Sequence, residues 1–244
     1  MLTRRAMIAA TAVAPCFAAF PAAAQVGDVR PRETLRVGQL DRVYRLVTPA
    51  GAGAGRPLII ALHGMGIDSI SLMPAYSGLD DLARAEGCVL AYPASFENHW
   101  PLSFGPKLAT ELAFFDALVN HLVRGLSLDP QRIYLTGMSN GGYFANVIAS
   151  RRGRYIAGLG VHSGSAGVLA LGRINSTRKF PVYISHGDAD PILGVQNGRD
   201  QAALYRRENH PVLYEEVAGM SHIWAPDPGA ANRTMWRFWA DNAA

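Results

Sequence analysis

Short apolar runs recur along the middle of the chain, and polar or glycine-rich turns separate them. These runs read LIIAL, CVLAYP, RIYLTG and VYISHG, and we predict two further strands at YIAGLGVHSG and VLYEEV. Runs of this length without alternation are typical of strands that lie buried in a parallel sheet. We therefore predict a strand at each run.

Segments with helical spacing lie between these runs. Leu79, Leu82 and Ala83 fall on one face of YSGLDDLARAEG, and residues 112–125 repeat this spacing after a predicted N-cap at Thr110. Further helices are predicted up to about residue 150, over DQAALYRRE and over AANRTMWRFWAD. Alternating strands and helices require crossover connections, which predicts an α/β fold with a mainly parallel central sheet and helices on both faces.

The pattern is different before the first buried run. Residues 36–49, RVGQLDRVYRLVTP, alternate apolar and polar positions, and GAGAGRP then interrupts the pattern. Strict alternation is typical of strands with one exposed face. We predict antiparallel strands at an edge of the sheet here.

The first residues have the composition of an export signal. Arg4 and Arg5 precede an alanine-rich apolar run, and small residues lead up to Gln25. We predict a signal peptide at residues 1–24, one globular domain at residues 25–244, and a secreted or periplasmic location. The arginine pair also resembles a twin-arginine signal, and an ordinary signal with two basic residues is the alternative.

Composition narrows the possible partners. At 244 residues, with 49% hydrophobic and 17% charged residues, the chain suits one sizeable core. The net charge of +4 comes from scattered arginines, which does not indicate nucleic-acid binding. After the leader, no apolar run approaches the roughly 18 residues of a membrane helix, so we expect no membrane insertion. We expect a monomer in which Cys88 is a buried, inert thiol without a disulfide partner.

A serine lies among glycines in GMSNGG, directly after the strand RIYLT and before the apolar residues of a predicted helix. Strand, sharp turn and helix form the context that the G-x-S-x-G motif requires. Such a turn brings the backbone close to its neighbours, where a Cβ atom would clash, so glycines at 137 and 141 are expected. Ser139 would then have strained backbone and an accessible hydroxyl. The motif alone also fits a plain strand-to-helix loop.

Two partners for this serine follow in the order that a hydrolase triad needs. Asp190 comes just after the strand VYISHG, and His222 comes just after VLYEEV. Serine is a weak nucleophile, and an imidazole held by a carboxylate can accept its proton. The interpretation is therefore a catalytic set of Ser139, Asp190 and His222. Asp188 competes for the acid role, although an aspartate in that position also suits a turn cap.

Acyl transfer also needs hydrogen-bond donors for the oxyanion. The backbone N–H of Asn140, the residue after the nucleophile, is one candidate, and that of Met65 in the HGMG loop is the other. No histidine or cysteine spacing resembles a metal site, and no glycine-rich phosphate loop follows a strand. We expect neither a metal nor another cofactor.

We expect the other six histidines to have structural rather than catalytic roles. We expect His63 and His186 to brace loops, because each precedes a glycine at the end of a strand. His162 either borders a pocket or lies in the core. Surface positions are expected for the others, which are His99, His121 and His210.

Several of these motifs together resemble a known family. The segments are PLIIALHG, CVLAYP, the tryptophan of NHW, DPQRIYLTGMSNGG, HGDADPI and GMSHIW, spread between Pro57 and Trp239. They resemble the polyhydroxybutyrate depolymerase-like esterases of the α/β-hydrolase superfamily, which include feruloyl and acetyl xylan esterases. The resemblance implies Ser139 as nucleophile, Asp190 and His222 as its acid and base partners, and the backbone of Met65 and Asn140 as the oxyanion hole.

The expected function is that of a secreted serine esterase on small-molecule or oligomeric esters of polyhydroxyalkanoate, feruloyl or acetyl type. The single cysteine after the leader and the lack of an appended polymer-binding module depart from many secreted members, which argues against action on solid polyester. The alternatives are a peptidase of the same fold and a catalytically silent exported binding protein. Trp100 and Trp224 are candidates for the substrate pocket, with core packing as the alternative for both. Specificity should depend on the loops at 67–76, 95–107 and 168–179.

Overall fold

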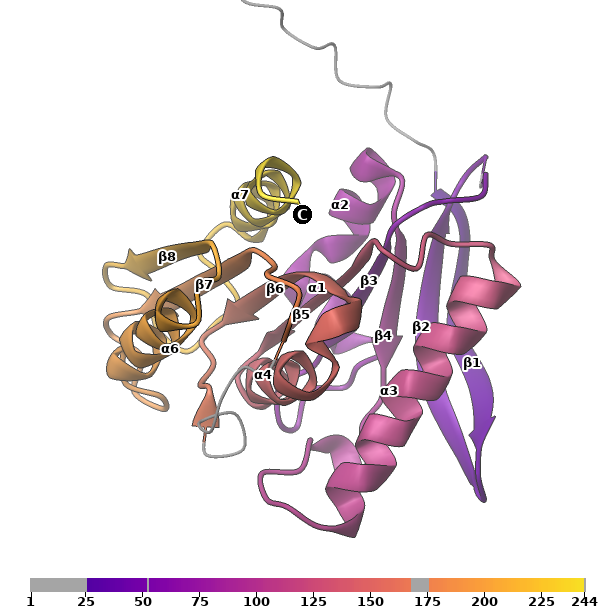
Figure 1. Cartoon of the computed structure of the whole chain (residues 1–244), viewed down its shortest axis with the longest axis horizontal. Helices are drawn as coiled ribbons and strands as arrows, with labels where there is room; N and C mark the ends of the chain where they lie inside the picture. Colours follow the sequence, from indigo (N-terminus) through magenta and orange to yellow (C-terminus); the bar gives the residue numbers. More distant parts are fainter. Residues whose placement is uncertain (1–25, 52, 168–175, 244) are drawn as a thin grey trace, which may run out of the picture.

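An eight-stranded sheet organises the protein (Figure 1), and its strand order is β1-β2-β4-β3-β5-β6-β7-β8. The computed structural model describes residues 26–51, 53–167 and 176–243. The predicted signal peptide and residues 168–175 of the predicted specificity loop lie outside these residues. The strands are β1 (Val26–Val37), β2 (Leu40–Pro49), β3 (Leu58–Leu62), β4 (Val89–Pro93), β5 (Ile133–Met138), β6 (Ile156–His162), β7 (Val182–Gly187) and β8 (Val212–Val217).

The pairing divides the sheet into an antiparallel edge and a parallel body. Strands β1, β2 and β4 pair antiparallel, whereas β4, β3, β5, β6, β7 and β8 pair parallel in that order. Both predictions, the antiparallel edge and the parallel body, are confirmed. The alternating edge pattern was visible only from residue 36, however, and β1 already begins at Val26.

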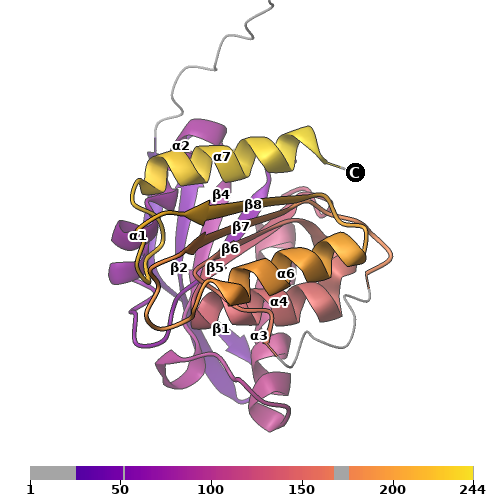
Figure 2. The ribbon, with the colours of Figure 1, turned by 90° about the vertical axis from the view of Figure 1, so that its left-hand side faces the viewer.

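Helices cover both faces of the sheet (Figure 2). They are α1 (Leu72–Ser77), α2 (Leu79–Glu86), α3 (Pro106–Gly125), α4 (Asn140–Arg152), α6 (Gln196–Arg207) and α7 (Pro228–Asp241), with short 3₁₀ turns at Phe96–Asn98 and Gly153–Tyr155. Helices α3, α4 and α6 lie on one face, and α2 and α7 lie on the other. The predicted α/β class with helices on both faces is confirmed.

Each face of the sheet has its own core. In β3, Leu58, Ile60 and Leu62 pack on the side of α3 and α4, whereas Ile59 and Ala61 pack on the side of α2 and α7. Successive side chains of a strand point to opposite faces, so a strand covered on both sides must be apolar throughout. This explains the unbroken apolar runs of the sequence.

Three helices begin earlier than their apolar spacing predicts. Helix α3 begins at Pro106, and Thr110, the predicted N-cap, lies inside the helix, where its hydroxyl donates to the Pro106 carbonyl over 3.0 Å. Proline suits the first helical position, because its missing N–H would have no partner there. Helix α6 begins at Gln196, and α7 begins at Pro228, where Asp227 caps the helix.

The buried positions include one histidine that the sequence interpretation placed at the surface. His210 is only 5% exposed, and its Nδ1 lies 2.9 Å from the Phe180 carbonyl oxygen. The polar neighbours of His210 in the sequence suggested exposure, but its ring packs against Phe180 and Tyr205. That prediction was wrong. Among the helices of the described chain, none is long and apolar enough to cross a membrane.

Candidate active site

The turn between β5 and α4 presents Ser139 at the carboxyl end of the parallel strands. Ser139 has a positive φ of 53° with ψ at −120°, a backbone conformation that is costly for a residue with a side chain. A Cβ atom on Gly141 would lie 2.3 Å from the Leu62 carbonyl oxygen, and one on Gly137 would lie 2.6 Å from the Gly141 backbone. The glycines of the motif therefore permit a turn that alanine would block.

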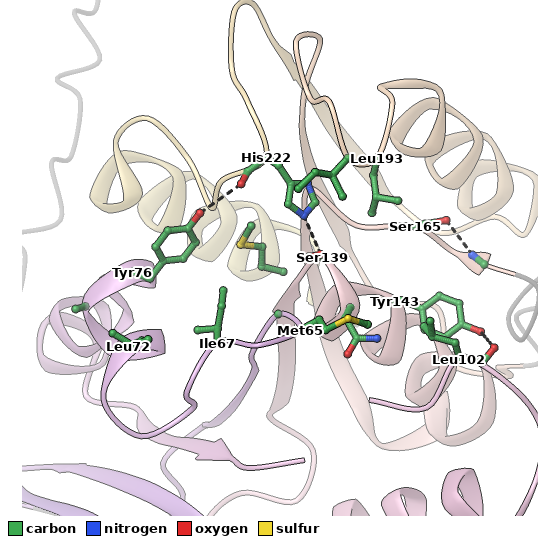
Figure 3. A pocket seen from close by; sticks show the side chains of 16 residues that line it. Met65, Ile67, Leu72, Tyr76, Leu102, Ser139, Tyr143, Ser165, Leu193 and His222 are labelled. Carbon is green, nitrogen blue, oxygen red and sulfur yellow. Dashed lines mark hydrogen bonds between the residues drawn. The ribbon is translucent and has the colours of Figure 1, made fainter. Parts of the chain in front are cut away.

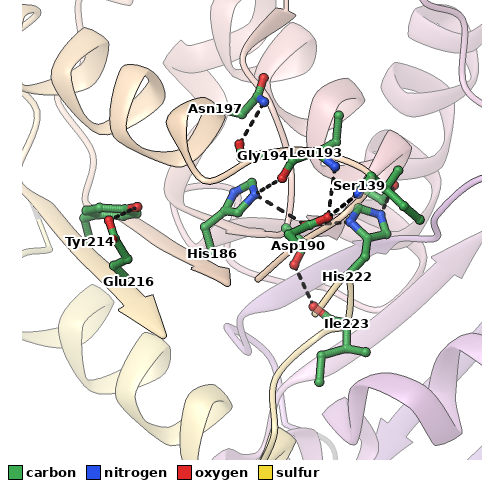
Figure 4. Close-up of polar contacts among 12 residues, drawn as sticks. Ser139, His186, Asp190, Leu193, Gly194, Asn197, Tyr214, Glu216, His222 and Ile223 are labelled. Atoms are coloured by element: carbon green, nitrogen blue, oxygen red, sulfur yellow. Dashed lines mark hydrogen bonds and ion pairs between the residues drawn. The ribbon is translucent and has the colours of Figure 1, made fainter. Parts of the chain in front are cut away.

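His222 lies between Ser139 and Asp190. Its Nε2 is 2.8 Å from the Ser139 hydroxyl oxygen, and its Nδ1 is 2.7 Å from Oδ2 of Asp190. The Asp190 side chain is fully buried, whereas the imidazole is 10% exposed. The three side chains come from the ends of β5, β7 and β8, so the parallel sheet brings them together (Figure 4). This is the contact pattern that proton transfer from a serine hydroxyl requires.

The Asp190 carboxylate is held from several sides. Its Oδ1 accepts hydrogen bonds from the backbone N–H groups of Ile192, over 2.8 Å, and Leu193, over 2.9 Å. Burial acts to raise the pKa of Asp190, but the hydrogen bonds from His222, Leu193 and Ile192 outweigh it, and the pKa is lowered. The group therefore remains a carboxylate at neutral pH.

His186 braces the other side of this carboxylate, as Figure 4 shows. Its Nε2 lies 2.7 Å from the Leu193 carbonyl oxygen and 3.4 Å from Oδ2 of Asp190. A carbonyl only accepts, so Nε2 carries the proton and donates to it. The ring thus ties the 190–193 turn to the end of β7.

Asp188 has a different partner, although only one residue separates it from Asp190. It is exposed, and its Oδ1 accepts a hydrogen bond from the backbone N–H of Gly219 over 2.7 Å. This contact joins the β7 loop to the loop that precedes His222. Asp188 therefore caps a turn, and Asp190 is the aspartate that contacts the imidazole.

Met65 and Asn140, the two predicted oxyanion positions, both line the cleft beside Ser139. Asn140 is the first residue of α4, where a backbone N–H has no partner within the helix. Its side chain accepts from the Trp100 backbone N–H over 2.6 Å and donates to the Trp100 carbonyl over 3.0 Å. The Gly66 N–H donates to the Asn98 carbonyl over 3.2 Å. The 98–100 segment is thus bound both to the side chain of Asn140 and to the residue that follows Met65.

Trp100 does not line the cleft, which corrects its interpretation as a pocket residue. It is 1% exposed, its ring stacks on Phe144 with centroids 4.8 Å apart, and its indole N–H donates to the His63 carbonyl over 2.9 Å. The indole is buried because the segment that carries it packs under the HGMG loop and against α4.

Trp224 also lies in the core. It is 1% exposed, stacks on His162 with centroids 3.7 Å apart, and donates from its indole N–H to Asn232 over 3.0 Å. Burial lowers the pKa of His162 to about 3, so this imidazole is neutral. Both tryptophans therefore pack in the core, which was the alternative to a pocket position, and His162 is a core residue as well.

A cleft of about 990 Å³ surrounds the Ser139 hydroxyl and His222 (Figure 3). Sequence reasoning missed the lining residues Tyr143 and Leu193. The available signal was position, since Tyr143 lies one helical turn after Ser139, and Leu193 follows Asp190 closely in the acid loop. Within residues 26–51, 53–167 and 176–243, no group of three histidine, cysteine or acidic side chains could hold a metal ion.

Comparisons with known proteins place this chain in a family. The family model described as "Esterase PHB depolymerase" matches residues 42–179. The chain is 34% identical over 171 residues to "Putative esterase NocK" of Nocardia uniformis subsp. tsuyamanensis, covering 66% of this chain and 48% of that protein. It is 28% identical over 190 residues to Feruloyl esterase C of Emericella nidulans, covering 74% of this chain and 67% of that protein.

Solved structures show the same fold. A thermostable esterase superposes with a TM-score of 0.72 at 19% identity, covering 90% of this chain and 64% of that one. A CE1 ferulic acid esterase from Anaeromyces mucronatus gives a TM-score of 0.67 at 18% identity, covering 89% and 93%. The predicted α/β-hydrolase fold is confirmed. The chain spans less than half of the length of the first curated relatives that it matches. The shares are 48%, 24% and 44%.

Proposed function

Because this chain belongs to the esterase PHB depolymerase family, we propose that it is a serine esterase that hydrolyses carboxylic esters through an acyl-enzyme. The observation that carries the proposal is the position of His222, which is 2.8 Å from the Ser139 hydroxyl and 2.7 Å from the Asp190 carboxylate. A serine, an imidazole and a carboxylate in this order form the minimal set for acyl transfer.

In the first half of the reaction, Oγ of Ser139 attacks the ester carbonyl carbon while Nε2 of His222 accepts the hydroxyl proton. The tetrahedral intermediate then collapses, the bond to the alcohol oxygen breaks, and His222 returns the proton to the departing alkoxide. The products are an alcohol and an ester between the acyl group and Ser139. In the second half, water loses a proton to His222 and attacks this ester; the bond between the acyl carbon and Oγ then breaks, the acid leaves, and His222 returns the proton to Oγ of Ser139.

Two further contributions support this sequence of steps. The Asp190 carboxylate accepts a hydrogen bond from Nδ1–H of His222, which keeps Nε2 free to act as the base and stabilises the imidazolium that forms. The backbone N–H groups of Met65 and Asn140, which line the cleft beside Ser139, are the proposed donors to the oxyanion.

Replacement of the nucleophile tests the proposal. Hydrolysis of short p-nitrophenyl esters by Ser139→Ala should fall roughly 10³-fold or more, because the acyl-enzyme cannot form. A fluorophosphonate should add its mass to the peptide that contains Ser139 in the wild type only. The control is Ser127→Ala, an exposed serine between α3 and β5, which should retain wild-type rates. Equal rates in the Ser139→Ala variant and the wild type would overturn the proposal.

The organisation of the chain is part of the same proposal. Residues 25–244 form a single catalytic domain, residues 1–24 are removed on export to a secreted or periplasmic location, and the enzyme is a monomer. The leader composition supports export, and the continuous sheet supports one domain. Intact-mass analysis of the exported protein should give an N-terminus at Gln25, and sedimentation should give the mass of one chain.

A further inference from the structure

The cleft extends to both sides of the Ser139 hydroxyl, as Figure 3 shows. On one side lies the α1 wall, which we define as Ile67, Leu72, Ala75 and Tyr76. On the other side lies the α4 wall, which we define as Leu102, Tyr143, Ser165 and Leu193. An ester bond at Ser139 therefore has space for its acyl group along one wall and for its alcohol group along the other.

Neither wall carries a charge. Among the sixteen described residues that line the cleft, none is Asp, Glu, Lys or Arg, and His222 is the one imidazole. The nearby Asp68 does not line the cleft, and its Oδ1 accepts from the N–H groups of Ile70 and Ser71 and from the Ser71 hydroxyl. A charged substrate group would find no partner of opposite sign on these walls.

The polar side chains in the cleft are already engaged with the protein. The Tyr143 hydroxyl donates to the Leu102 carbonyl over 3.1 Å, and the Tyr76 hydroxyl contacts the His222 carbonyl at 3.5 Å. Ser165 accepts from the Gly167 N–H over 3.1 Å, and the Asn140 amide is bound at both ends to Trp100. The tyrosines and the asparagine thus present mainly their apolar surfaces to a ligand.

The walls are apolar even where they reach solvent. Leu72 is 57% exposed and Leu102 is 51% exposed, and Met65 and Ile192, which also line the cleft, are 56% and 68% exposed. Side chains of this size lose contact with water when a ligand covers them, which favours an apolar ligand. A cleft of about 990 Å³ is in the range that accommodates drug-sized ligands, far larger than an acetyl group.

We propose that the substrate is an uncharged ester with an apolar acyl group longer than acetyl and an apolar alcohol group, one along each wall. This inference rests on the proposed esterase function and narrows its substrate class. It disfavours esters whose acyl or alcohol group bears a free carboxylate, and acetyl esters of polar sugars. Each group would be recognised by burial of its hydrocarbon, with the polar contacts confined to the ester carbonyl and the reacting oxygen atoms.

A chain-length series of ethyl esters, from acetate to octanoate, tests the acyl side. We expect kcat/KM to rise two- to fourfold for each added methylene, since complete burial of a methylene corresponds to about fourfold. The alcohol side is tested with ethyl, butyl and hexyl butanoate, for which a rise is expected as well. A flat or falling profile on both sides would overturn the inference.

A charged analogue isolates the electrostatic part of the argument. Monoethyl adipate carries a carboxylate at the end of a chain similar in length to that of ethyl heptanoate. We expect its kcat/KM to be lower by about 100-fold or more, because the walls offer no partner for a buried charge. If the two kcat/KM values differ by less than about threefold, the proposal that the cleft selects uncharged substrates is wrong.

Paired variants assign the effect to the walls. Leu72→Asp and Leu102→Asp place a carboxylate on the α1 wall and the α4 wall, and the exposure of both leucines limits the cost to folding. Each variant should flatten the length dependence on one side of the ester bond, with ethyl acetate hydrolysis least affected. Val29→Asp, on β1 and also exposed, is the matched control that should keep the wild-type profile. Unchanged profiles in both wall variants would overturn the assignment.

Failure of this inference is distinguishable from failure of the proposed function. If the enzyme hydrolyses esters and fluorophosphonate labels Ser139, but acetyl or carboxylate esters are preferred, the substrate class is wrong and the esterase proposal stands. If no ester is hydrolysed and Ser139 is not labelled, both proposals fail.

Discussion

The two sides of Ser139 are built from different kinds of contact. On the acid–base side, titratable side chains contact each other, with His222 between Ser139 and Asp190. On the oxyanion side, neutral backbone and amide groups hold one another, as the Asn140 amide does with both polar backbone groups of Trp100. In the proposed mechanism, the first side moves protons, whereas the second fixes the positions of donors. Substitutions on the two sides should therefore have different signatures.

The largest expected effect belongs to Asp190. In Asp190→Asn, kcat should fall by about 10³- to 10⁴-fold, because an amide does not hold the catalytic tautomer of His222 or stabilise the imidazolium. Asp188→Asn is the matched control from the same loop, since Asp188 bonds to the Gly219 N–H and not to the imidazole. Its kcat should stay within about tenfold of the wild type. Steady-state kinetics on one p-nitrophenyl ester decides between the two aspartates, and a larger loss in Asp188→Asn would reverse the assignment.

A smaller effect is expected on the oxyanion side. Trp100→Phe removes the indole N–H that donates to the His63 carbonyl, next to the loop that carries Met65. A small displacement of an oxyanion donor should lower kcat by about 10- to 100-fold with little change in KM. The measurement is kcat and KM together with the free energy of unfolding in urea.

Trp239→Phe is the control for this variant. It removes a similar bond, from the fully buried indole N–H of Trp239 on α7 to the Leu159 carbonyl over 3.1 Å. Both variants should lose roughly 0.5–1.5 kcal/mol of stability, because each loses one buried hydrogen bond. Only Trp100→Phe should lose kcat, and an equal loss of kcat in both would show that Trp100 has no positioning role.

The same contrast explains what the sequence could and could not predict. The residues Ser139, Asp190 and His222 each follow a strand of the parallel sheet, so the strand pattern and the chain order in the sequence are enough to locate them. The role of Trp100 depends on contacts with His63 and Phe144, which different strands and helices contribute, and local sequence carries no record of those contacts. An indole suits both a pocket and a core, and only the fold decides between them.

The predicted starts of the helices were wrong for a related reason. Apolar spacing marks the part of a helix that packs on the sheet, whereas the first turn of α3 extends into solvent from Pro106. The signal for that turn was a proline suited to the first helical position, which is local and independent of packing. His210 shows the converse, because its polar neighbours in the sequence say nothing of the aromatic rings that enclose it.

The smallest expected effect is on the free energy of unfolding rather than on catalysis, and it comes from the buried histidines of the core. Burial lowers the pKa of His162 from 6.5 to about 3, so between these values the unfolded chain binds a proton that the folded chain does not. Stability is therefore complete above pH 6.5 and is lost as the pH falls toward 3. Burial lowers the pKa values of His63 and His210 too, so they add in the same direction.

At pH 5.5, His162 alone should lower the free energy of unfolding by about 1.4 kcal/mol relative to pH 7.5, a factor of about ten in the unfolding equilibrium. Urea unfolding at the two pH values measures this difference. In His162→Asn, which retains a donor for the Trp224 carbonyl but does not titrate, the difference should shrink by that amount. His121→Asn, at an exposed position on α3, is the control that should leave the difference unchanged. If His162→Asn has the same pH dependence as the wild type, the buried imidazole is already protonated or is hydrated, and the assignment of a neutral His162 to the core fails.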